Sequence, residues 1–531
     1  MLSRFWSVLF CGLALLGAAT SGVAADAPPA SPPRFAIADY RVEGNTLLPA
    51  AEVQAVLAPF TGAGKDFGTV QEALEALQQA YHRRGFKTVA ILIPEQELAG
   101  GTVRLTIIEP KVKSVAIEGN SFFNADNIRH SLPGLQEGTT PDLDAISASL
   151  RVANGNPAKK GTLTLRGGAT PEELAATLKM VDEKPWQIGV SLDDTGNDAT
   201  GDLRLGFFFS HANLFNRDHL LTLQYKTSTE HPEDVGIYAI GYRLPLYSLG
   251  DSLDLYAAYA DIDSGTVSTG VVDLNVAGKG TILGARYNQN LAHRGEYEHF
   301  ISYGIDYRAY ENDVEIFNIP IGSDVTVHPV SLTYSGLWKG RSSMAGFHLG
   351  LARNIAGGSN GKSEDFRLVR QDASAHYTLF RFGGDFSWLL PADWQAGARL
   401  NGQYTNDSLV PGEFFGLGGA GSVRGFDERE LADDRGYFTS VELRTPDLAP
   451  LLTIPKGQLR LLAFYDTGSV DRVDPLPGEI NRQTIASIGG GLRFNLGRQF
   501  AAETFYGHVV DGGGASDTGD GRWHFSLRYA Y

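Results

Sequence analysis

Two stretches in the C-terminal half of the chain contain residues that could form an ion pair. The first, residues 411–435, is rich in glycine and contains the motif Val423-Arg424-Gly425-Phe426. The second is the motif Phe464-Tyr465-Asp466-Thr467-Gly468. A planar guanidinium can hold a carboxylate through two parallel hydrogen bonds, which a lysine ammonium cannot reproduce. Arg424 and Asp466 are therefore candidates for such a pair, whose chemistry would be positional rather than catalytic.

The second motif lies in a run, residues 458–470, that alternates between polar or small side chains and apolar ones. In an extended strand such alternation places neighbouring residues on opposite faces. Phe464, Asp466 and Gly468 share the polar face, so Asp466 is expected to point inward. Gly468 would leave room on that face for a backbone to approach, and Gly425 would allow a tight loop tip. The alternative for Arg424 is a solvated position, which is usual for an arginine in a polar loop.

The sequence offers no other chemistry of comparable specificity. Gly416, Gly418 and Gly421 have the spacing of a dinucleotide fingerprint, but they lack the preceding buried strand and the following helix that such a site needs. The twelve histidines include no H-E-x-x-H motif, and the aspartate-rich loops lack the spacing of an EF-hand. No Ser-His-Asp arrangement can be singled out. We expect no catalytic residue, no cofactor and no bound metal.

Composition narrows the class of protein. The chain has 531 residues, enough for two or more domains, and its 63 glycines and 10% aromatic residues suit many strands and turns. The formal net charge of -16 argues against nucleic acid as a partner, because that needs a basic surface. Cys11 is the only cysteine, so a mature exported chain would have neither disulfides nor thiolate metal sites.

The N-terminus has the features of a secretory signal peptide, predicted at residues 1–25. Arg4 supplies the positive charge, residues 5–19 form a mostly apolar run, and Val23-Ala24-Ala25 provides small residues for cleavage. The alternative, a membrane anchor, would need about 20 apolar residues, and this run is shorter. No later stretch approaches that length, so a mature chain that crosses a membrane must do so with strands. A proline-rich lead follows at residues 26–35.

Residues 36–110 and 111–184 are predicted to form two similar α+β modules. Tyr40-Arg41-Val42-Glu43-Gly44-Asn45 and Val115-Ala116-Ile117-Glu118-Gly119-Asn120 each join an alternating strand to a Gly-Asn turn, one small domain apart. Both modules are expected to have the order β-α-α-β-β. The predicted helices lie at 49–59, 70–84, 125–132 and 141–153, and the predicted later strands at 88–94, 102–109, 161–166 and 174–181.

From residue 185 to 531, period-2 alternation dominates and no regular helix is expected. This pattern predicts an antiparallel transmembrane β-barrel with an apolar outer face and a polar lumen. A soluble β-sandwich also alternates, but aromatic residues near many strand ends favour a barrel with interfacial girdles. In the last strand the outward residues are Trp523, Phe525, Leu527, Tyr529 and Tyr531. These five residues are also expected to be the C-terminal signal for barrel assembly.

Sixteen strands are predicted, and an even number places both barrel ends on the periplasmic side. Their starts are expected near residues 186, 202, 219, 235, 252, 279, 298, 325, 343, 371, 394, 436, 458, 482, 499 and 521. Short turns should be periplasmic and long loops extracellular. Residues 267–274 could form a further strand, but counting them would break the parity, so they are left out. Arg424 falls in a long loop between two of these strands, residues 408–435.

Together, the modules, the barrel and the two motifs resemble the Omp85 superfamily. Within it they are similar to the TpsB transporters of two-partner secretion, the hemolysin and hemagglutinin secretion/activation proteins. Ser191-Leu192-Asp193-Asp194-Thr195-Gly196 looks like the first hairpin of that family's barrel. The modules resemble POTRA domains, and two of them favour a TpsB protein over the bacterial barrel-assembly protein, which has more. The resemblance implies that the sixth loop folds into the barrel and that Arg424 pairs there with Asp466.

The resemblance implies an outer-membrane transporter and no enzymatic activity. Its POTRA-like modules would capture an unfolded exoprotein in the periplasm at the exposed edges of their sheets, and that chain would thread through the lumen. Other expected partners are outer-membrane lipid and, during biogenesis, the barrel-assembly machinery and periplasmic chaperones. Three alternatives stay open: an Omp85-type factor that inserts outer-membrane proteins, a passive porin, and a surface adhesin.

Overall fold

The computed structural model describes residues 33–97, 99–197, 200–261, 265–276, 279–311, 315–316, 319–320 and 323–531. The predicted signal peptide and most of the proline-rich lead lie outside these residues. In the described part of the chain, no helix is long and apolar enough to cross a membrane. The described residues up to Tyr81, with Ala90–Ile108, form one compact unit, and His82–Val89 with Glu109–Tyr531 form a second.

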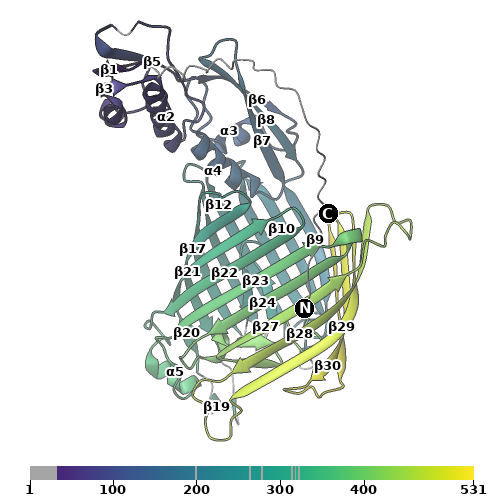
Figure 1. Ribbon diagram of the computed structural model, residues 1–531. Coiled ribbons are helices and arrows are strands. Elements are labelled where there is room, and N and C mark those ends of the chain that lie inside the picture. Colours follow the sequence, from purple (N-terminus) through teal and green to yellow (C-terminus); the bar gives the residue numbers. More distant parts are fainter. Residues whose placement is uncertain are drawn as a thin grey trace, which may run out of the picture. The chain divides into compact units, whose positions relative to one another are not determined.

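The first unit contains a three-stranded sheet with two helices (Figure 1). In chain order its elements are β2 (Asp39–Glu43), α1 (Ala50–Leu57), α2 (Phe67–Arg83), β4 (Ala90–Leu92) and β5 (Thr102–Ile108). β5 is the central strand, parallel to β2 and antiparallel to β4. A small separate ladder pairs β1 (Phe35–Ile37) with β3 (Gly62–Lys65). Alternate residues of β5 and one face of α2 are buried, which builds the core between sheet and helix.

The second unit begins with a module of the same β-α-α-β-β order, as the sequence predicts. Its elements are β6 (Lys111–Glu118), α3 (Ala125–His130), α4 (Leu143–Asn154), β7 (Lys159–Gly167) and β8 (Glu173–Asp182). The central strand β8 is parallel to β6 and antiparallel to β7. Side chains cap both helices: Asn124 accepts from the N–H of Asn127, and Asp142 accepts from two N–H groups at the start of α4. Such caps satisfy N–H groups that a helix leaves unbonded at its N-terminus.

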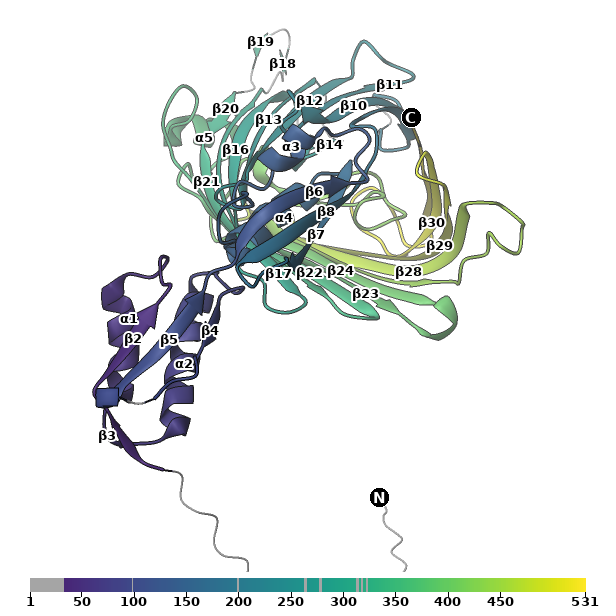
Figure 2. The same cartoon turned by 90° about the horizontal axis from the view of Figure 1, so that it is seen from above.

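The rest of the second unit is a closed antiparallel barrel of sixteen described strands, which Figure 2 shows from above. β20 and β21 both pair with β17 and count as one strand interrupted at His328. Pairing of β31 with β9 closes the wall. The strands are β9 (Trp186–Asp193), β10 (Arg204–Leu214), β11 (His219–Ser228), β12 (Gly236–Leu246), β13 (Asp251–Asp261), β16 (Gly280–Asn290), β17 (Tyr297–Tyr310), β20 (Val325–Val327), β21 (Pro329–Lys339), β22 (Ser343–Asn354), β23 (Thr378–Leu389), β24 (Gln395–Tyr404), β27 (Arg435–Arg444), β28 (Gly457–Asp471), β29 (Arg482–Leu496), β30 (Phe500–Asp511) and β31 (Gly521–Ala530).

One predicted strand start is wrong. The strand expected from residue 371 begins at Thr378, and a helix that the alternation did not predict, α5 (Ser363–Val369), lies in the loop before it. Phe366 of α5 and Tyr377 are fully buried in one cluster with Val327 and Leu409. This segment is therefore held by side chains from several loops, and it has no strand partner there. Burial against distant residues overrides a local pattern in such a case.

Shorter elements lie in the loops of the barrel. Residues 267–274, left out of the strand count, belong to a separate hairpin of β14 (Gly265–Ser268) and β15 (Asp273–Val276). A second small hairpin joins β18 (Glu315–Ile316) to β19 (Ile319–Pro320), and a third joins β25 (Phe415–Leu417) to β26 (Leu431–Asp433). Single 3₁₀ turns in the loops of the barrel are η3 (Pro391–Asp393) and η4 (Pro411–Glu413), and the first unit has two more, η1 (Ala58–Phe60) and η2 (Ala99–Gly101).

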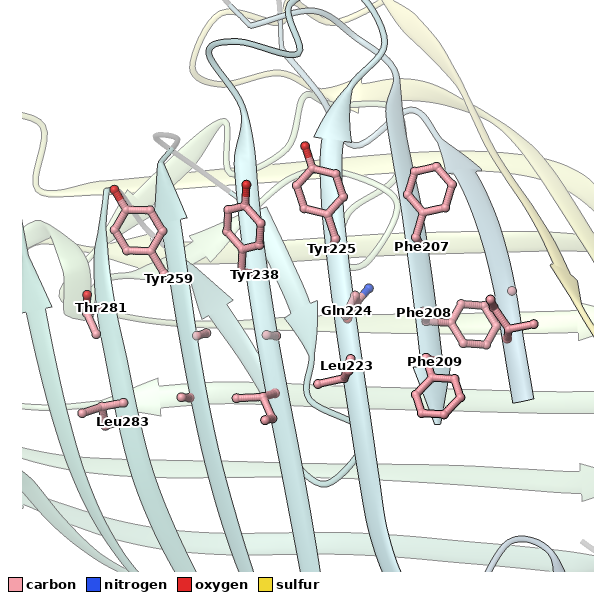
Figure 3. A pocket seen from close by; sticks show the side chains of 16 residues that line it. Phe207, Phe208, Phe209, Leu223, Gln224, Tyr225, Tyr238, Tyr259, Thr281 and Leu283 are labelled. Atoms are coloured by element: carbon pink, nitrogen blue, oxygen red, sulfur yellow. The ribbon is translucent and has the colours of Figure 1, made fainter. Parts of the chain in front are cut away.

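Large apolar side chains cover the outer face of the barrel. Figure 3 shows Phe207, Tyr225, Tyr238 and Tyr259 in a row across β10, β11, β12 and β13, above aliphatic residues such as Leu223. The rings of Tyr225 and Tyr238 stack with centroids 4.9 Å apart. Tyr238 is 52% exposed, which would be costly in water for a whole row of rings but is normal against lipid. The row is one part of the aromatic girdle that the sequence predicts.

Candidate functional site

The loop between β24 and β27, residues 405–434, lies inside the barrel wall and carries the predicted site. It starts near η4, forms the small β25–β26 ladder, and presents residues 418–430 as a glycine-rich tip. The amide of Gln403 on β24 donates to the carbonyl oxygens of Glu413, at 2.8 Å, and Asp434, at 3.0 Å. One wall side chain therefore holds both ends of the loop together.

Arg424 at the tip contacts Asp466 on β28 in the bidentate geometry expected of such a pair. Its Nε donates to Asp466 Oδ2 at 2.7 Å and its Nη2 donates to Oδ1 at 2.8 Å. The backbone N–H of Arg424 also donates to Oδ2, at 3.2 Å. Arg424 is 4% exposed and Asp466 is fully buried. Asp466 faces the lumen because Phe464 and Gly468 share its buried side of the strand, whereas Tyr465 is exposed on the other side.

Further side chains complete the pocket around the guanidinium. Arg424 Nη1 donates to Glu442 Oε1 at 2.7 Å and Nη2 donates to Ser440 Oγ at 3.1 Å, both on β27. The guanidinium carbon lies 3.5 Å from the centre of the Phe464 ring, a cation–π contact. Glu442 is also bound by two other wall arginines, Arg444 and Arg493. The arginine is thus bound through all three nitrogens, so its position is fixed in every direction.

The other motif residues seat the tip against the wall. Val423 and Phe426 are fully buried, in one cluster with Leu417, Phe438 and Val509. Gly425 has φ +96°, a conformation that side chains disfavour. A Cβ on Gly507 of β30 would lie 2.6 Å from the Gly425 nitrogen, so the loop backbone passes over Gly507.

At Gly468 a Cβ would lie 2.8 Å from Cδ2 of Leu417 and 2.8 Å from the carbonyl oxygen of Tyr437 on β27. Gly468 therefore makes room for a loop side chain as well as for the backbone of the neighbouring strand. The loop backbone itself passes over Gly507, which sequence reasoning missed.

The base of the loop is bound to other strands of the wall than the tip is. Glu413, 2% exposed, accepts from Arg308 Nη1 at 2.8 Å, Tyr310 Oη at 2.8 Å and Arg381 Nη2 at 3.1 Å. These partners lie on β17 and β23. At the other end the Asp434 carboxylate accepts hydrogen bonds from both terminal nitrogens of Arg370, at 2.6 and 2.9 Å. The loop is therefore fastened at its tip and at both ends.

Sequence reasoning missed Glu413, Glu442 and His524 as site residues. Strand alternation does place Glu442 and His524 on inward faces, as it does Asp466. Alternation cannot say which loop atom an inward side chain will meet, because that depends on how the barrel closes. Glu413 has no such signal, since it lies in an irregular loop.

The C-terminal strand β31 has the predicted alternation. Trp523, Leu527, Tyr529 and Tyr531 are exposed on the outer face, Phe525 is half-buried, and His524 between them is buried. The Tyr531 N–H donates to the Ile188 carbonyl at 2.8 Å, and the rings of Tyr531 and Trp186 lie 5.9 Å apart. The end of the chain thus contributes to wall closure. Its use as an assembly signal remains a prediction.

Two cavities occupy the lumen. One, of about 790 Å³, is lined by polar and charged wall residues such as Arg243, Asp254, Asn288 and Ser302, and by Arg151 of α4. The other, of about 710 Å³, borders the loop at Glu413, Gly418 and Glu428. The lumen is thus polar and partly filled, with the loop bordering one cavity and the second module bordering the other.

Comparison with known proteins agrees with this architecture. A family model for the haemolysin secretion/activation proteins ShlB/FhaC/HecB matches residues 176–494, and one for the POTRA domain of ShlB type matches residues 35–110. The outer membrane transporter CdiB of Escherichia coli O6:K15:H31 (strain 536 / UPEC) is 25% identical over 456 residues, which cover 83% of this chain and 74% of CdiB. The heme/hemopexin transporter protein HuxB of Haemophilus influenzae (strain 86-028NP) is 20% identical over 468 residues, covering 87% and 80%.

Solved structures show the same fold. The structure of CdiB from Escherichia coli superimposes with a TM-score of 0.71 at 20% identity and covers 96% of this chain and 93% of that one. CdiB from Acinetobacter baumannii gives 0.66 at 18% identity, with coverage of 94% and 91%. The family match spans the second module's last strand and most of the barrel, including both motifs. Because it covers more than half of the chain, the chain belongs to the haemolysin secretion/activation protein family ShlB/FhaC/HecB.

Proposed function

We propose that this outer-membrane transporter of two-partner secretion passes an unfolded exoprotein through its lumen, beside the loop that Arg424 holds in place. The observation that carries the proposal is the seating of that loop: a buried bidentate pair at the tip and Glu413 at the base, next to polar lumenal cavities. The pair acts by position and takes part in no bond-breaking step. Release or displacement of the tip would widen the path for the substrate.

The periplasmic modules offer the first contact with the exoprotein. In each three-stranded sheet the central strand has a strand partner on both sides, and the outer strands, β2 and β4 in the first and β6 and β7 in the second, each have one edge without a strand partner among the described residues. An extended segment can add to such an edge through main-chain hydrogen bonds, which tolerate many sequences. This supports capture of an unfolded chain rather than of a folded protein.

The lumen offers a path for the captured chain. Polar side chains and water can bind the amide groups of a naked chain, whereas hydrocarbon cannot. The described residues include no phosphate-binding loop, so we infer that folding of the exoprotein outside the cell drives its passage. For assembly of the transporter itself, periplasmic chaperones would bring the unfolded chain to the barrel-assembly machinery. That machinery would then recognise the outward residues of β31.

The test is secretion by an Arg424→Ala variant of an exoprotein encoded next to the transporter gene. We expect normal amounts of folded barrel in the outer membrane and a clear loss of exoprotein in the medium. The matched control is Arg482→Ala, which removes a bidentate pair with Asp471 between β28 and β29 at an exposed position. Exposed pairs contribute little, so this control should secrete normally. Normal secretion by Arg424→Ala at normal barrel levels would remove the pair from the mechanism.

A further inference from the structure

His524 on β31 lies where three parts of the barrel meet. Its side chain is 1% exposed. The backbone N–H of Gly425, at the loop tip, donates to His524 Nε2 at 3.0 Å. On the other side, His524 Nδ1 lies 3.0 Å from Oδ2 of Asp194, which follows directly after β9. Because Nε2 accepts a hydrogen bond, the proton of the neutral ring is on Nδ1 and is donated to Asp194.

Asp194 belongs to the closure of the wall. The ladder between β31 and β9 ends at the pair Ser526 with Asp193, and it covers only residues 189–193 of β9. The ladder between β9 and β10 covers residues 186–193, so the closing ladder is the shorter one. Beyond its end, the Phe525 N–H donates to Asp194 Oδ1 at 2.9 Å, and the Asp194 N–H donates to the Phe525 carbonyl at 3.4 Å. The contact of Asp194 with β31 thus extends the closure past the last paired residues.

We propose that His524 is a positioning residue. It couples the binding of the loop tip, through Gly425, to the closure of the wall between β31 and β9. When the wall is closed, Asp194 holds the ring so that Nε2 faces Gly425. If this end of the wall opens, Asp194 moves away with β9 and the buried ring loses its acceptor. The ring is then free to turn, and the tip loses one of its polar attachments to the wall, the hydrogen bond from Gly425. Coupling of this kind is reciprocal, so release of the tip also weakens the closure.

Charged groups around the ring do not replace this link. Glu428 of the loop uses its carboxylate to accept the Ala420 N–H at 2.9 Å. Arg522, two residues before His524 on the chain, pairs with Asp427 and lies 3.7 Å from Asp202. Arg424 is occupied by Asp466 and Glu442. Among the described residues, Asp194 is the only carboxylate with a hydrogen bond to the His524 ring.

The experiment follows tip release without any substrate, so its outcome does not depend on the proposed secretion mechanism. A Val423→Cys reporter in the full chain, reconstituted in liposomes, reacts with N-ethylmaleimide only when the tip leaves, because Val423 is fully buried. The one native cysteine, Cys11, lies in the predicted signal peptide. A separate Ser359→Cys protein, labelled on an exposed extracellular loop, reports the intrinsic reactivity of a thiol.

Two substitutions of His524 separate its two links. His524→Gln retains an acceptor at the place of Nε2 but has no donor near Asp194. His524→Asn retains a group near Asp194 but does not reach Gly425. We expect labelling of the reporter to be about tenfold faster with Asp194→Ala, the effect on the tip when the ring loses its charge-assisted hydrogen bond to Asp194. In the His524→Gln background Asp194→Ala should have no further effect, and His524→Asn alone should resemble Asp194→Ala.

The effect of Asp194→Ala on labelling, measured with and without His524→Gln, decides whether the two residues are coupled. Non-additive effects of Asp194 and His524 support the coupling. Equal acceleration by Asp194→Ala with and without His524→Gln would overturn it, since Asp194 would then act on the tip by another route. Should Asp194→Ala fail to insert, Asp194→Asn, which can satisfy only one of its two present donors, is compared in the same way. Asp471→Ala is the control for loss of a wall carboxylate far from the tip, and it should leave labelling unchanged.

Discussion

A buried arginine is stable only where its charge and all its donors are satisfied, and Arg424 meets this condition. Asp466 and Glu442 supply the negative charge, and Ser440 takes a remaining donor. Replacing such a pair with apolar groups can be nearly neutral, but removing one partner leaves the other charge buried and alone. The pair therefore specifies where the tip sits more than it raises the stability of the barrel as a whole.

The Arg424–Asp466 pair predicts non-additive stability effects. Arg424→Ala and Asp466→Ala should each lower the free energy of unfolding by about 3 kcal/mol, because each leaves a buried charged group without its bidentate partner. The double variant should lose about as much as either single one, and less than their sum. Urea unfolding in lipid or detergent measures all three. Additive losses would show that the two residues act separately in the native barrel.

The burial of Tyr40 predicts that the stability of the first unit falls at alkaline pH. It is 7% exposed and its hydroxyl has no hydrogen-bond partner among the described residues. Burial raises the pKa of Tyr40 from 10.0 to about 12. Because the folded pKa lies above the unfolded one, the stability that this group contributes is complete below pH 10 and is lost as the pH rises toward 12. The difference in absorbance titration between the full chain and Tyr40→Phe should show a tyrosine that ionises near 12, and ionisation near 10 would contradict the burial.

At the scale of elements, the loop between β13 and β16 also enters the lumen. Val271 and Val272 pack against inward apolar residues such as Ile237 and Tyr256. A Cβ on Gly241 would lie 1.9 Å from the Thr269 carbonyl oxygen, so the loop fits over a glycine of β12. Val272 lines both lumenal cavities. The turn at residues 269–272 therefore narrows the lumen beside both cavities.

Gly270 allows a test of this constriction. It has φ +75°, and a Cβ there would lie 2.3 Å from Oγ1 of Thr222 on β11. Gly270→Val should displace the turn at residues 269–272 from the lumen and raise the single-channel conductance in planar bilayers. Gly478→Val is the matched control, because Gly478 has φ +96° but a Cβ there would meet no atom within 4 Å. Equal conductance of the two variants would mean that the turn at residues 269–272 does not limit ion flow through the lumen.

The second module is fixed to the barrel by a buried polar cluster. Asp218, in the turn between β10 and β11, accepts from Lys159 Nζ of β7 at 2.5 Å, from Asn127 Nδ2 at 2.8 Å and from the Tyr247 hydroxyl. The side chains of Lys159 and Asp218 are 1% and 2% exposed. Burial lowers the pKa of Lys159, and the Asp218 carboxylate opposes this shift. The charged pair thus compensates part of the cost of burying both groups.

Asp218→Ala should release this attachment. It leaves the Lys159 amine buried without its partner, which costs about 3 kcal/mol, and hydrogen exchange in α3 and α4 should accelerate accordingly. The control is Glu183→Ala, which removes an exposed pair with Arg498 on the same side of the barrel and should change exchange little. Combining Lys159→Met with Asp218→Ala should restore part of the protection. Unchanged exchange in Asp218→Ala would show that apolar packing alone holds the module.

At the scale of the whole molecule, an even number of strands places both barrel ends on one side. The second module precedes β9 and contacts the turn at Asp218, so the short turns lie on the periplasmic side with it. Ser359, in the long connection between β22 and β23, then lies outside the cell. Leu452, in the turn between β27 and β28 and 60% exposed, lies in the periplasm.

Labelling with a membrane-impermeant maleimide tests this topology. Ser359→Cys should react in intact cells, whereas Leu452→Cys should react only after the outer membrane is made permeable. Both side chains are exposed in the folded protein, so the difference reports the side of the membrane and not burial. Labelling of Leu452→Cys in intact cells would mean an inverted barrel or an odd number of spans.

The sequence by itself determined which way each strand residue faces and how many strands close the wall. Alternation is a local pattern that needs no knowledge of a residue's partners, and it placed Asp466 on an inward face. The sequence also showed directly the glycine at 425 and the two motifs, residues 423–426 and 464–468.

Only the tertiary structure decided what those inward side chains meet. The link of Glu413 to β17 and β23, the passage of the tip over Gly507 and the contact of His524 with Asp194 join residues far apart in the chain. α5 likewise depends on burial against other loops. Such contacts follow from closure of the barrel and from the path of long loops, and neither leaves a periodic signal in the sequence.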